Sequence, residues 1–150
     1  MLSKKTKYAI KALVALAKSD KSMTISEIAA QESIPKKFLE SILLDMRKQG
    51  LLGSKIGIGG GYHLIKKPKD IVLTQLLRSI DGPIAMIPCV SLNFYEPCED
   101  CVDEVTCGIR SAFIEVRDAS LKILAGITLE DILKREEHLK VLKKRKKQQE

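Results

Sequence analysis

The sequence predicts a mainly α-helical fold with one small β-hairpin, and three observations lead to this prediction. Apolar residues recur at three- and four-residue steps in several segments separated by capping residues, glycine and proline. A glycine cluster within residues 56–61 lies between two short segments that read as strands. One long segment, residues 107–125, carries an apolar stripe at near-heptad spacing. We therefore expect a small helical domain with a hairpin, followed by one long helix.

Length and composition indicate one compact domain with an appended element. The chain has 150 residues, and its 45% hydrophobic content is enough for a core. No apolar run is long enough to span a bilayer, and the N-terminus leads into an amphipathic pattern without the features of a signal peptide. We expect a cytoplasmic protein without a membrane partner. In that reducing compartment, clustered cysteines favour metal ligation or thiol chemistry over structural disulfides.

The net charge of +7 is distributed unevenly along the chain. Residues 1–70 carry 14 Lys and Arg against 6 Asp and Glu, whereas residues 71–133 carry 4 against 10. Residues 134–150 are basic again, with 8 against 3. A basic N-terminal half is the electrostatic signature of a polyanionic partner, and nucleic acid is the leading candidate.

Three helices are expected in the basic half. Ser3 is a candidate cap for a helix that runs to about Ser19, and Thr24 with Glu27 forms a capping-box pattern for a short helix. A third helix follows Pro35 over residues 36–49 and ends at Gly50. Its buried stripe is expected to comprise Leu39, Ile42, Leu43 and Met46.

The second and third helices, joined by a short turn, form a helix-turn-helix pattern whose second helix can enter the major groove of DNA. The glycine cluster then suits a wing between strands at residues 51–55 and 62–65. A nucleotide-binding loop is disfavoured, because no helix with a Lys-Ser/Thr pair follows the glycines. The candidate DNA-binding residues are Lys4, Tyr8, Lys36, Lys37, Glu40, Ser41, Ser54, Lys55, Gly59, Gly60 and Tyr62.

The C-terminal half contains a loop and two further helices after a short helix that Thr74 is expected to cap. Residues 83–106 have three prolines and no helical period, so they form an ordered loop only if something holds them. The helix over residues 107–125 is expected to form a dimer interface, because a small winged helix has little surface to cover its stripe. The interface residues would be Ile109, Ala112, Phe113, Val116, Ala119 and Ile123.

Thr128 and Asp131 are expected to cap a last helix through Leu133, before a basic tail over residues 134–150 that is frayed or disordered. The fold class is thus a winged helix-turn-helix domain plus a long dimerisation helix. We divide the chain into a DNA-binding domain (1–82), a cysteine-rich sensor loop (83–106), a dimerisation segment (107–133) and the tail.

The four cysteines are Cys89, Cys98, Cys101 and Cys107, and they leave several chemistries open. Four thiolates complete a tetrahedral zinc site or supply the ligands of an iron-sulfur cluster. One close pair flanked by two lone cysteines is less typical of zinc, which favours a cluster mildly. Acidic neighbours such as Glu99 and Asp100 argue against a low thiol pKa from charge alone, which weakens a metal-free thiolate sensor.

Taken as a whole, the chain resembles the Rrf2-type winged-helix transcription regulators, which include IscR-like iron-sulfur and NsrR-like nitric-oxide-sensing members. The resemblance runs from about Leu2 to Leu133. It is carried by Lys7-Tyr8-Ala9, by residues 34–40 at the start of the recognition helix, by residues 51–62 through the wing, by Pro88-Cys89-Val90 with the later cysteines, and by residues 127–132.

The resemblance implies a homodimer on a roughly palindromic DNA operator, with recognition helices in successive major grooves and wings along the flanking minor grooves or backbone. In relatives that bind a [2Fe-2S] or [4Fe-4S] cluster, three cysteines of this loop and a non-cysteine residue hold it. Here Arg110 replaces the histidine of IscR-like members, and Tyr8 replaces the first-helix carboxylate of NsrR-like members. Either all four cysteines ligate a cluster, or Cys89, Cys101 and Cys107 do so and Cys98 is spare.

Two other readings remain. Some relatives bind no cluster and sense through thiols, disulfides or protein partners, so a cluster-free regulator of the same fold is possible. A redox enzyme or a zinc-binding interaction protein without a DNA role is more remote. The Cys98–Cys101 pair lacks a thioredoxin-like strand-helix-strand context, and the histidines, His63 and His138, make a poor catalytic Cys-His pair. We expect no enzyme activity.

Overall fold

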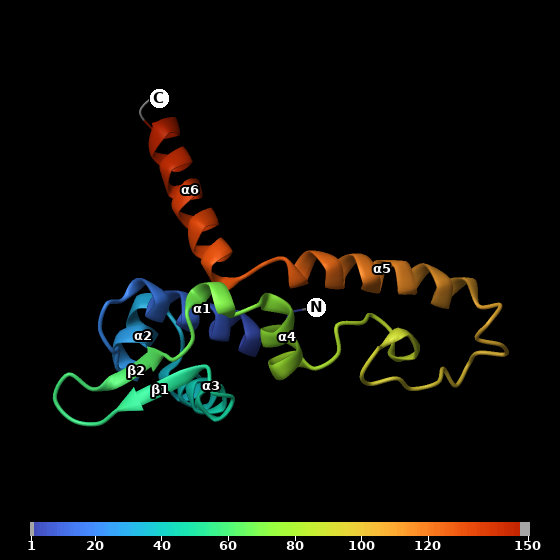
Figure 1. The fold of residues 1–150 in the computed structure, drawn as a ribbon, viewed down its shortest axis with the longest axis horizontal. Helices are drawn as coiled ribbons and strands as arrows, with labels where there is room; N and C mark the ends of the chain where they lie inside the picture. The colour runs from blue at the N-terminus through green and yellow to red at the C-terminus, as the bar shows by residue number, and fades with distance from the viewer. Residues whose placement is uncertain (1, 148–150) are drawn as a thin grey trace. The chain divides into compact units, whose positions relative to one another are not determined.

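The computed structural model describes residues 2–147, which form helices and a two-stranded antiparallel sheet (Figure 1). Contacts within the chain define two compact units. The first unit contains residues up to Ile71 together with those from Thr128 onward, and the second contains Val72–Ile127. The predicted class, mainly helical with a small β-wing, is confirmed.

The three predicted N-terminal helices are present as α1 (Lys4–Lys18), α2 (Ile25–Glu32) and α3 (Lys36–Lys48). The Oγ of Ser3 accepts a hydrogen bond from the Thr6 amide at 3.1 Å, as expected of an N-cap. At the start of α2, Thr24 and Glu27 exchange both hydrogen bonds of the capping box. These local bonds satisfy amides that the helix itself leaves without partners, so they fix where both helices begin.

The core of the first unit lies between the inner faces of these helices. All four residues predicted for the buried stripe of α3 are at most 1% exposed. They are joined by fully buried side chains from the other elements, each of which contributes roughly 1.5–3 kcal/mol of hydrophobic stabilisation. These partners are Leu13 of α1, Ile28 of α2, Leu52 and Leu129. Because the inner face of α3 is used up in this core, its opposite face is left for solvent or a ligand.

The hairpin that follows α3 consists of β1 (Leu52–Lys55) and β2 (Gly61–Leu64), paired in register from Leu52 with Leu64 to Lys55 with Gly61. Strand β2 also forms an isolated antiparallel β-bridge with Met23, which the sequence did not indicate. The Met23 amide donates to the Tyr62 carbonyl at 2.9 Å, and the Tyr62 amide donates to the Met23 carbonyl at 2.7 Å. The segment before α2 therefore ties the wing to the helix-turn-helix.

The last helix, α6 (Leu129–Lys147), is longer than predicted. Its cap is as expected, since Asp131 and Thr128 exchange capping hydrogen bonds. The Leu129 amide donates to the Ile71 carbonyl just after a short 3-10 turn, η1 (Pro68–Asp70). The basic tail that we expected to be frayed or disordered continues this helix to Lys147, and the i,i+4 ion pairs of Lys134 with Glu130 and of Lys140 with Glu136 lie along its earlier turns. Residues 148–150 of that tail lie outside the described residues.

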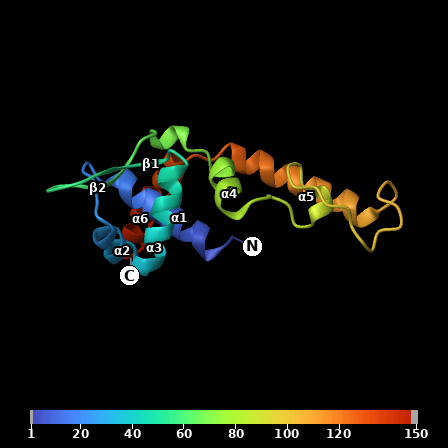
Figure 2. The same ribbon diagram turned by 90° about the horizontal axis from the view of Figure 1, so that it is seen from below.

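The second unit contains α4 (Leu73–Asp81), a 3-10 turn η2 (Pro88–Val90) and α5 (Gly108–Ala125) (Figure 2). The prediction that Thr74 caps α4 is wrong, because the helix begins one residue earlier, at Leu73. The Leu73 amide already donates to the Ile127 carbonyl at 2.9 Å, so it needs no side-chain cap. The Thr74 hydroxyl is instead buried without a hydrogen-bond partner among the described residues.

The crowded backbone at Gly61 generates a stability prediction. A Cβ at Gly61, whose φ is +134°, would overlap the Met23 carbonyl, whereas a Cβ at Gly59, with φ +73°, would meet nothing within 4 Å. Gly59→Ala should lower the free energy of unfolding by about 1–2 kcal/mol through backbone strain alone. Gly61→Ala should cost on the order of 3 kcal/mol or more, because overlap adds to strain. Urea unfolding of both variants measures this, and equal losses would contradict the crowding argument.

Candidate nucleic-acid interface and cysteine loop

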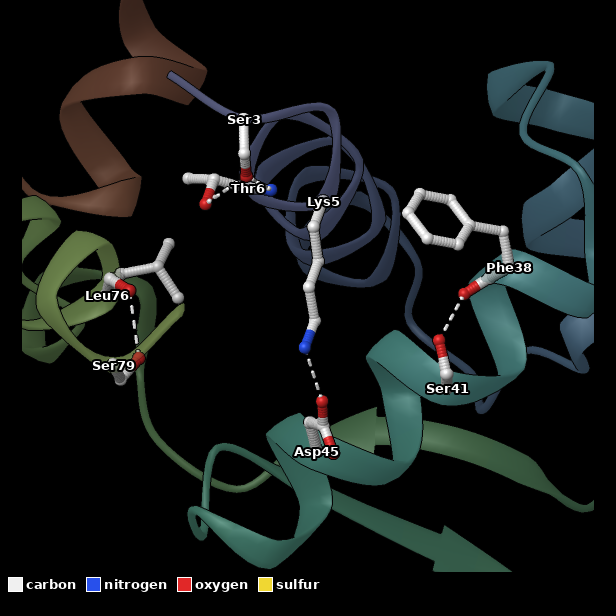
Figure 3. Close-up of polar contacts among 8 residues, drawn as sticks. All are labelled: Ser3, Lys5, Thr6, Phe38, Ser41, Asp45, Leu76 and Ser79. Atoms are coloured by element: carbon white, nitrogen blue, oxygen red, sulfur yellow. Dashed lines mark hydrogen bonds and ion pairs between the residues drawn. The ribbon is translucent and has the colours of Figure 1, made fainter. Parts of the chain in front are cut away.

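The outer face of α3 is exposed and mainly polar and basic, although Phe38 and Leu44 are also exposed. Lys36, Lys37, Glu40 and Ser41 are all solvent-exposed on the first two turns. Ser33 ends α2 in the left-handed region at φ 53°, and Pro35 then starts α3, so the turn between the helices is short. The Ser41 hydroxyl donates to the Phe38 carbonyl at 2.9 Å (Figure 3). Ser41 is therefore left to act as an acceptor.

The start of α1 is fixed against α3 by an ion pair and an aromatic contact. Lys5 Nζ lies 2.7 Å from Asp45 Oδ2, and this hydrogen bond lowers the pKa of Asp45 below its usual value (Figure 3). Tyr8 packs edge-to-face on Phe38, with ring centroids 5.6 Å apart. Lys4, by contrast, is exposed. The candidate residues Lys4 and Tyr8 are thus carried on a helix whose position relative to α3 is set by specific contacts.

The wing adds a second set of candidate contacts beside α3. Ser54, Lys55 and Gly59 are exposed, while Gly60 and Tyr62 are half-buried. Arg47 of α3 donates from Nη1 to the Ser54 Oγ at 3.1 Å, which joins the helix to β1. Arg47 was not among the predicted site residues. Arg47 and Ser54 are seven residues apart across the Gly50 turn, and this spacing matches no recognisable motif, so the contact could not be predicted from sequence.

Two of the four cysteines form a close thiol pair at the start of α5. The side chains of Cys101 and Cys107 lie close enough for each to shift the pKa of the other. Cys107 caps α5, and its Sγ accepts from the Arg110 amide at 3.4 Å. That amide bond is the main cause of a lowered pKa of the Cys107 thiol, whereas desolvation raises the pKa of Cys101. The pair thus combines one thiol that ionises readily with one that holds its proton.

The other two cysteines have contrasting environments. Cys89, in η2, is only 6% exposed, and η2 packs against α5. Arg117 of α5 holds that turn by donating from Nη1 to the Val90 carbonyl at 2.6 Å. Cys98 is exposed, and its backbone carbonyl accepts from the Cys101 amide at 3.3 Å. Cys98 therefore lies on the loop beside the thiol pair, whereas Cys89 is fixed in the packed part of the unit.

A polar network closes the loop over the start of α5. The Tyr95 hydroxyl donates to Glu104 Oε1 at 2.5 Å, which raises the pKa of Tyr95. Glu104 Oε2 lies 3.5 Å from Arg110 Nε, an ion pair too long for a hydrogen bond. Arg110, which stands where IscR-like relatives have histidine, thus supports the loop through Glu104.

The four cysteines have the right ligand atoms for an iron-sulfur cluster, but their side chains are not gathered around one point. All four are free thiols, and thiolates are the ligands that such clusters take. Cys107 and Cys98 are both close enough to influence the pKa of Cys101. Within residues 2–147, however, no three His, Cys, Asp or Glu side chains are gathered into a metal site. A cluster held with Cys89 as a ligand would therefore require the loop to close around it.

The helix α5 exposes the stripe predicted for a dimer interface. None of its residues is buried in the single chain. Ile109 is 67% exposed, Val116 42% and Ile123 64%, and Ala112 and Ala119 are exposed beside them. Phe113 is half-buried. This stripe is distinct from the polar flank of the same helix, which comprises Ser111, Glu115, Asp118 and Lys122.

A short α2, a tight turn, an α3 with a basic outer face and a two-stranded hairpin define a winged helix-turn-helix DNA-binding protein. The chain belongs to the Rrf2 family, whose description is iron-dependent transcriptional regulator and whose model matches residues 2–135. It is thus a DNA-binding transcription regulator and not an enzyme. None of the helices within residues 2–147 is long and apolar enough to cross a membrane.

Similar proteins agree with this assignment. A protein of Rhodobacter capsulatus, named an rrf2-like HTH-type transcriptional regulator, is 49% identical over 138 residues, covering 89% of this chain and 92% of that protein. The HTH-type transcriptional regulator NsrR of Geobacillus kaustophilus is 30% identical over 148 residues, covering 97% of this chain and 98% of the relative.

Solved structures are similar over most of their length. CymR, the global cysteine regulator of B. subtilis, superimposes with a TM-score of 0.74 at 28% identity, covering 90% of this chain and 97% of that one. IscR of T. potens gives a TM-score of 0.70 at 26% identity, covering 93% and 90%.

Proposed function

We propose that this chain is a cytoplasmic, homodimeric, sequence-specific DNA-binding regulator that represses transcription by occupying a palindromic operator, and that its cysteine loop senses iron-sulfur, redox or nitric-oxide status. The observation that carries the DNA-binding part is the division of α3 into two faces. Its apolar face is at most 1% exposed, and its outer face is polar and basic. Such a helix presents hydrogen-bonding side chains at the depth of the major groove.

The side chains of α3 suit the base edges in different ways. Lys36 and Lys37 donate to acceptors such as guanine O6 and N7, and Glu40 accepts from the cytosine amino group. Ser41 accepts, because its proton is used within the helix. The remaining candidates position the backbone through phosphate contacts. These are Lys4, Tyr8, Ser54, Lys55, Gly59, Gly60 and Tyr62.

Replacement of Lys37 tests the face of α3 placed on DNA. A duplex selected from a random pool by the wild-type protein serves as the probe. Lys37→Ala should weaken binding about tenfold or more. If Lys37 contacts a base, the variant should also lose sequence preference at that position. If Lys37 contacts a phosphate, the slope of the logarithm of the binding constant against the logarithm of the salt concentration should fall by about one. Lys134→Ala, which removes the same charge from α6, is the matched control and should leave binding nearly unchanged. If the Lys37→Ala and Lys134→Ala variants bind the duplex with equal affinity in fluorescence anisotropy, the outer face of α3 is not the face that contacts DNA.

The homodimer is supported by the exposed stripe of α5. An 18-residue helix with no buried residue leaves apolar area in water, and a second copy related by a two-fold axis would cover it with the same stripe. The proposed interface comprises Ile109, Ala112, Phe113, Val116, Ala119 and Ile123.

A charge placed in the stripe tests the dimer. Val116→Asp should shift the protein from dimer to monomer in light scattering, because the carboxylate would be buried without a partner. Ser111→Asp adds the same charge to the polar flank of α5 and should remain dimeric. A dimeric Val116→Asp protein would show that the interface lies elsewhere.

For the sensor we propose a [2Fe-2S] or [4Fe-4S] cluster held by Cys89, Cys101 and Cys107, with Cys98 as a fourth ligand or a spare thiol. When bound, the cluster supplies a redox- and nitric-oxide-sensitive cross-link of the loop. The support is the proximity of Cys101 to Cys107, each of which shifts the pKa of the other, and the lowered pKa of Cys107, since the thiolate is the ligating form. Because Cys107 caps α5, ligation there would act directly on the start of the proposed dimer helix.

The same thiol pair favours a second candidate, a cluster-free thiol sensor. Cys101 and Cys107 could join in a disulfide, losing two protons and two electrons to an external oxidant. The chain is similar to CymR, the global cysteine regulator of B. subtilis, as well as to IscR of T. potens.

Cys107→Ser separates these candidates while retaining a hydroxyl cap for α5. If a cluster is present, anaerobically purified wild-type protein absorbs at about 400–450 nm, and the variant loses this absorbance because a ligand is lost. Ser111→Ala, one turn further along α5, should keep the colour. Colourless wild-type protein that forms a Cys101–Cys107 disulfide, detected by mass spectrometry after oxidation, would support the thiol sensor instead. Unchanged colour in Cys107→Ser would contradict ligation by this residue.

A further inference from the structure

The tip of the wing carries two isoleucines that are completely exposed. Ile56 and Ile58 have relative exposures of 102% and 110%, so neither side chain packs against the rest of the described chain. Single exposed apolar residues are common on protein surfaces and need no explanation. Here, however, two β-branched apolar side chains are placed within three residues at the end of a hairpin that extends away from the helices of its unit (Figures 1 and 2).

The backbone of the tip is built to present these two side chains. Gly57 and Gly59 have φ values of +100° and +73°, and the Gly60 amide donates to the Gly57 carbonyl at 2.9 Å. A Cβ at Gly60 would lie 2.5 Å from the Lys55 carbonyl oxygen. Glycine is thus required for this tight turn. Between Lys55 and Tyr62, the side chains of Ile56 and Ile58 are consequently the only ones present.

The surroundings of the tip indicate an anionic partner. Lys55 directly precedes the tip, and Lys66 and Lys67 follow β2; all three are exposed. A partner must therefore offer negative charge together with a narrow apolar surface. The minor groove of duplex DNA does so, because phosphates line its edges while deoxyribose groups form its walls. Where the base pairs are A·T, the floor lacks the guanine amino group and the groove is narrow.

We propose that Ile56 and Ile58 form an apolar wedge that enters the minor groove beside each half-site and selects A·T over G·C pairs there. This inference rests on the proposed DNA-binding function and adds a specificity determinant to it. The two side chains pack against deoxyribose and the adenine edge, as apolar wedges of minor-groove proteins do. A guanine amino group at the same place obstructs the wedge. It would also lose its hydrogen bond to water without gaining a hydrogen-bond acceptor on the protein, which costs binding free energy.

The test uses the full-length chain and one core duplex selected by the wild-type protein, flanked in turn by A·T, G·C or inosine·C pairs. Inosine lacks the minor-groove amino group but keeps the major-groove face of guanine. Wild-type protein should bind the A·T and inosine·C flanks equally and the G·C flank about tenfold more weakly, comparable to one mismatched pair. Ile56→Ser/Ile58→Ser should bind all three duplexes alike, at the weaker affinity.

Two control variants separate the wedge from general effects on the wing. Ile65→Ser removes another exposed isoleucine, 59% exposed and just after β2, and should keep the flank preference. Ile56→Val/Ile58→Val keeps a branched apolar tip and should keep it as well. A wild-type protein that binds its selected duplex without flank preference, or a serine variant that retains the preference, would overturn the wedge alone. A wild-type protein that selects and binds no duplex would overturn the proposed function first.

Discussion

The burial of the inner face of α3 against α1 and α2 is the interaction on which the DNA-binding unit depends. Leu39, Ile42, Leu43 and Met46 are almost wholly removed from water, so the rotation of α3 about its own axis is fixed. That rotation determines which side chains face outward. The Lys5–Asp45 ion pair and the Tyr8–Phe38 contact add little hydrophobic area, but they hold the start of α1 next to the same helix. The polar face therefore follows from the core.

The cysteine loop is held by a different kind of interaction, because it has little apolar area to bury. Regular structure between α4 and α5 is limited to the turn η2. Arg117 holds that turn at the Val90 carbonyl, and Tyr95, Glu104 and Arg110 connect the far part of the loop to α5. Polar contacts of this kind near the surface are individually weak. A loop held in this way can change conformation at low cost, which a sensor requires and a core does not permit.

Much of the first unit could be predicted from sequence because its signals are local. Capping residues, the stripe of α3 and the glycine turn each act within a few residues, and the structure confirms them. The failed prediction for Thr74 and the unpredicted contacts depended on distant partners. Thr74 lost its capping role to a hydrogen bond between Leu73 and Ile127, more than fifty residues apart in the chain. The Met23–Tyr62 bridge and the proximity of Cys101 to Cys107 likewise arise from tertiary geometry, which residue spacing does not specify.

The position of Cys107 makes the loop, α5 and the proposed dimer energetically interdependent. An isolated helix of this length is marginal in water, so α5 needs packing on more than one face. One face packs against η2 and α4 within the unit, and the exposed stripe would be covered by a second copy of the chain in the proposed dimer. Cys107 supplies the cap at the end where the loop arrives, and its sulfur already accepts a helix amide. A chemical change at this sulfur would alter the helix that a dimer shares. Two chain connections, at Ile71–Val72 and at Ile127–Thr128, link that helix to the DNA-binding unit. If Cys107 receives the proposed signal, the thiol that caps the start of α5 would need no separate relay to act on the proposed dimer helix.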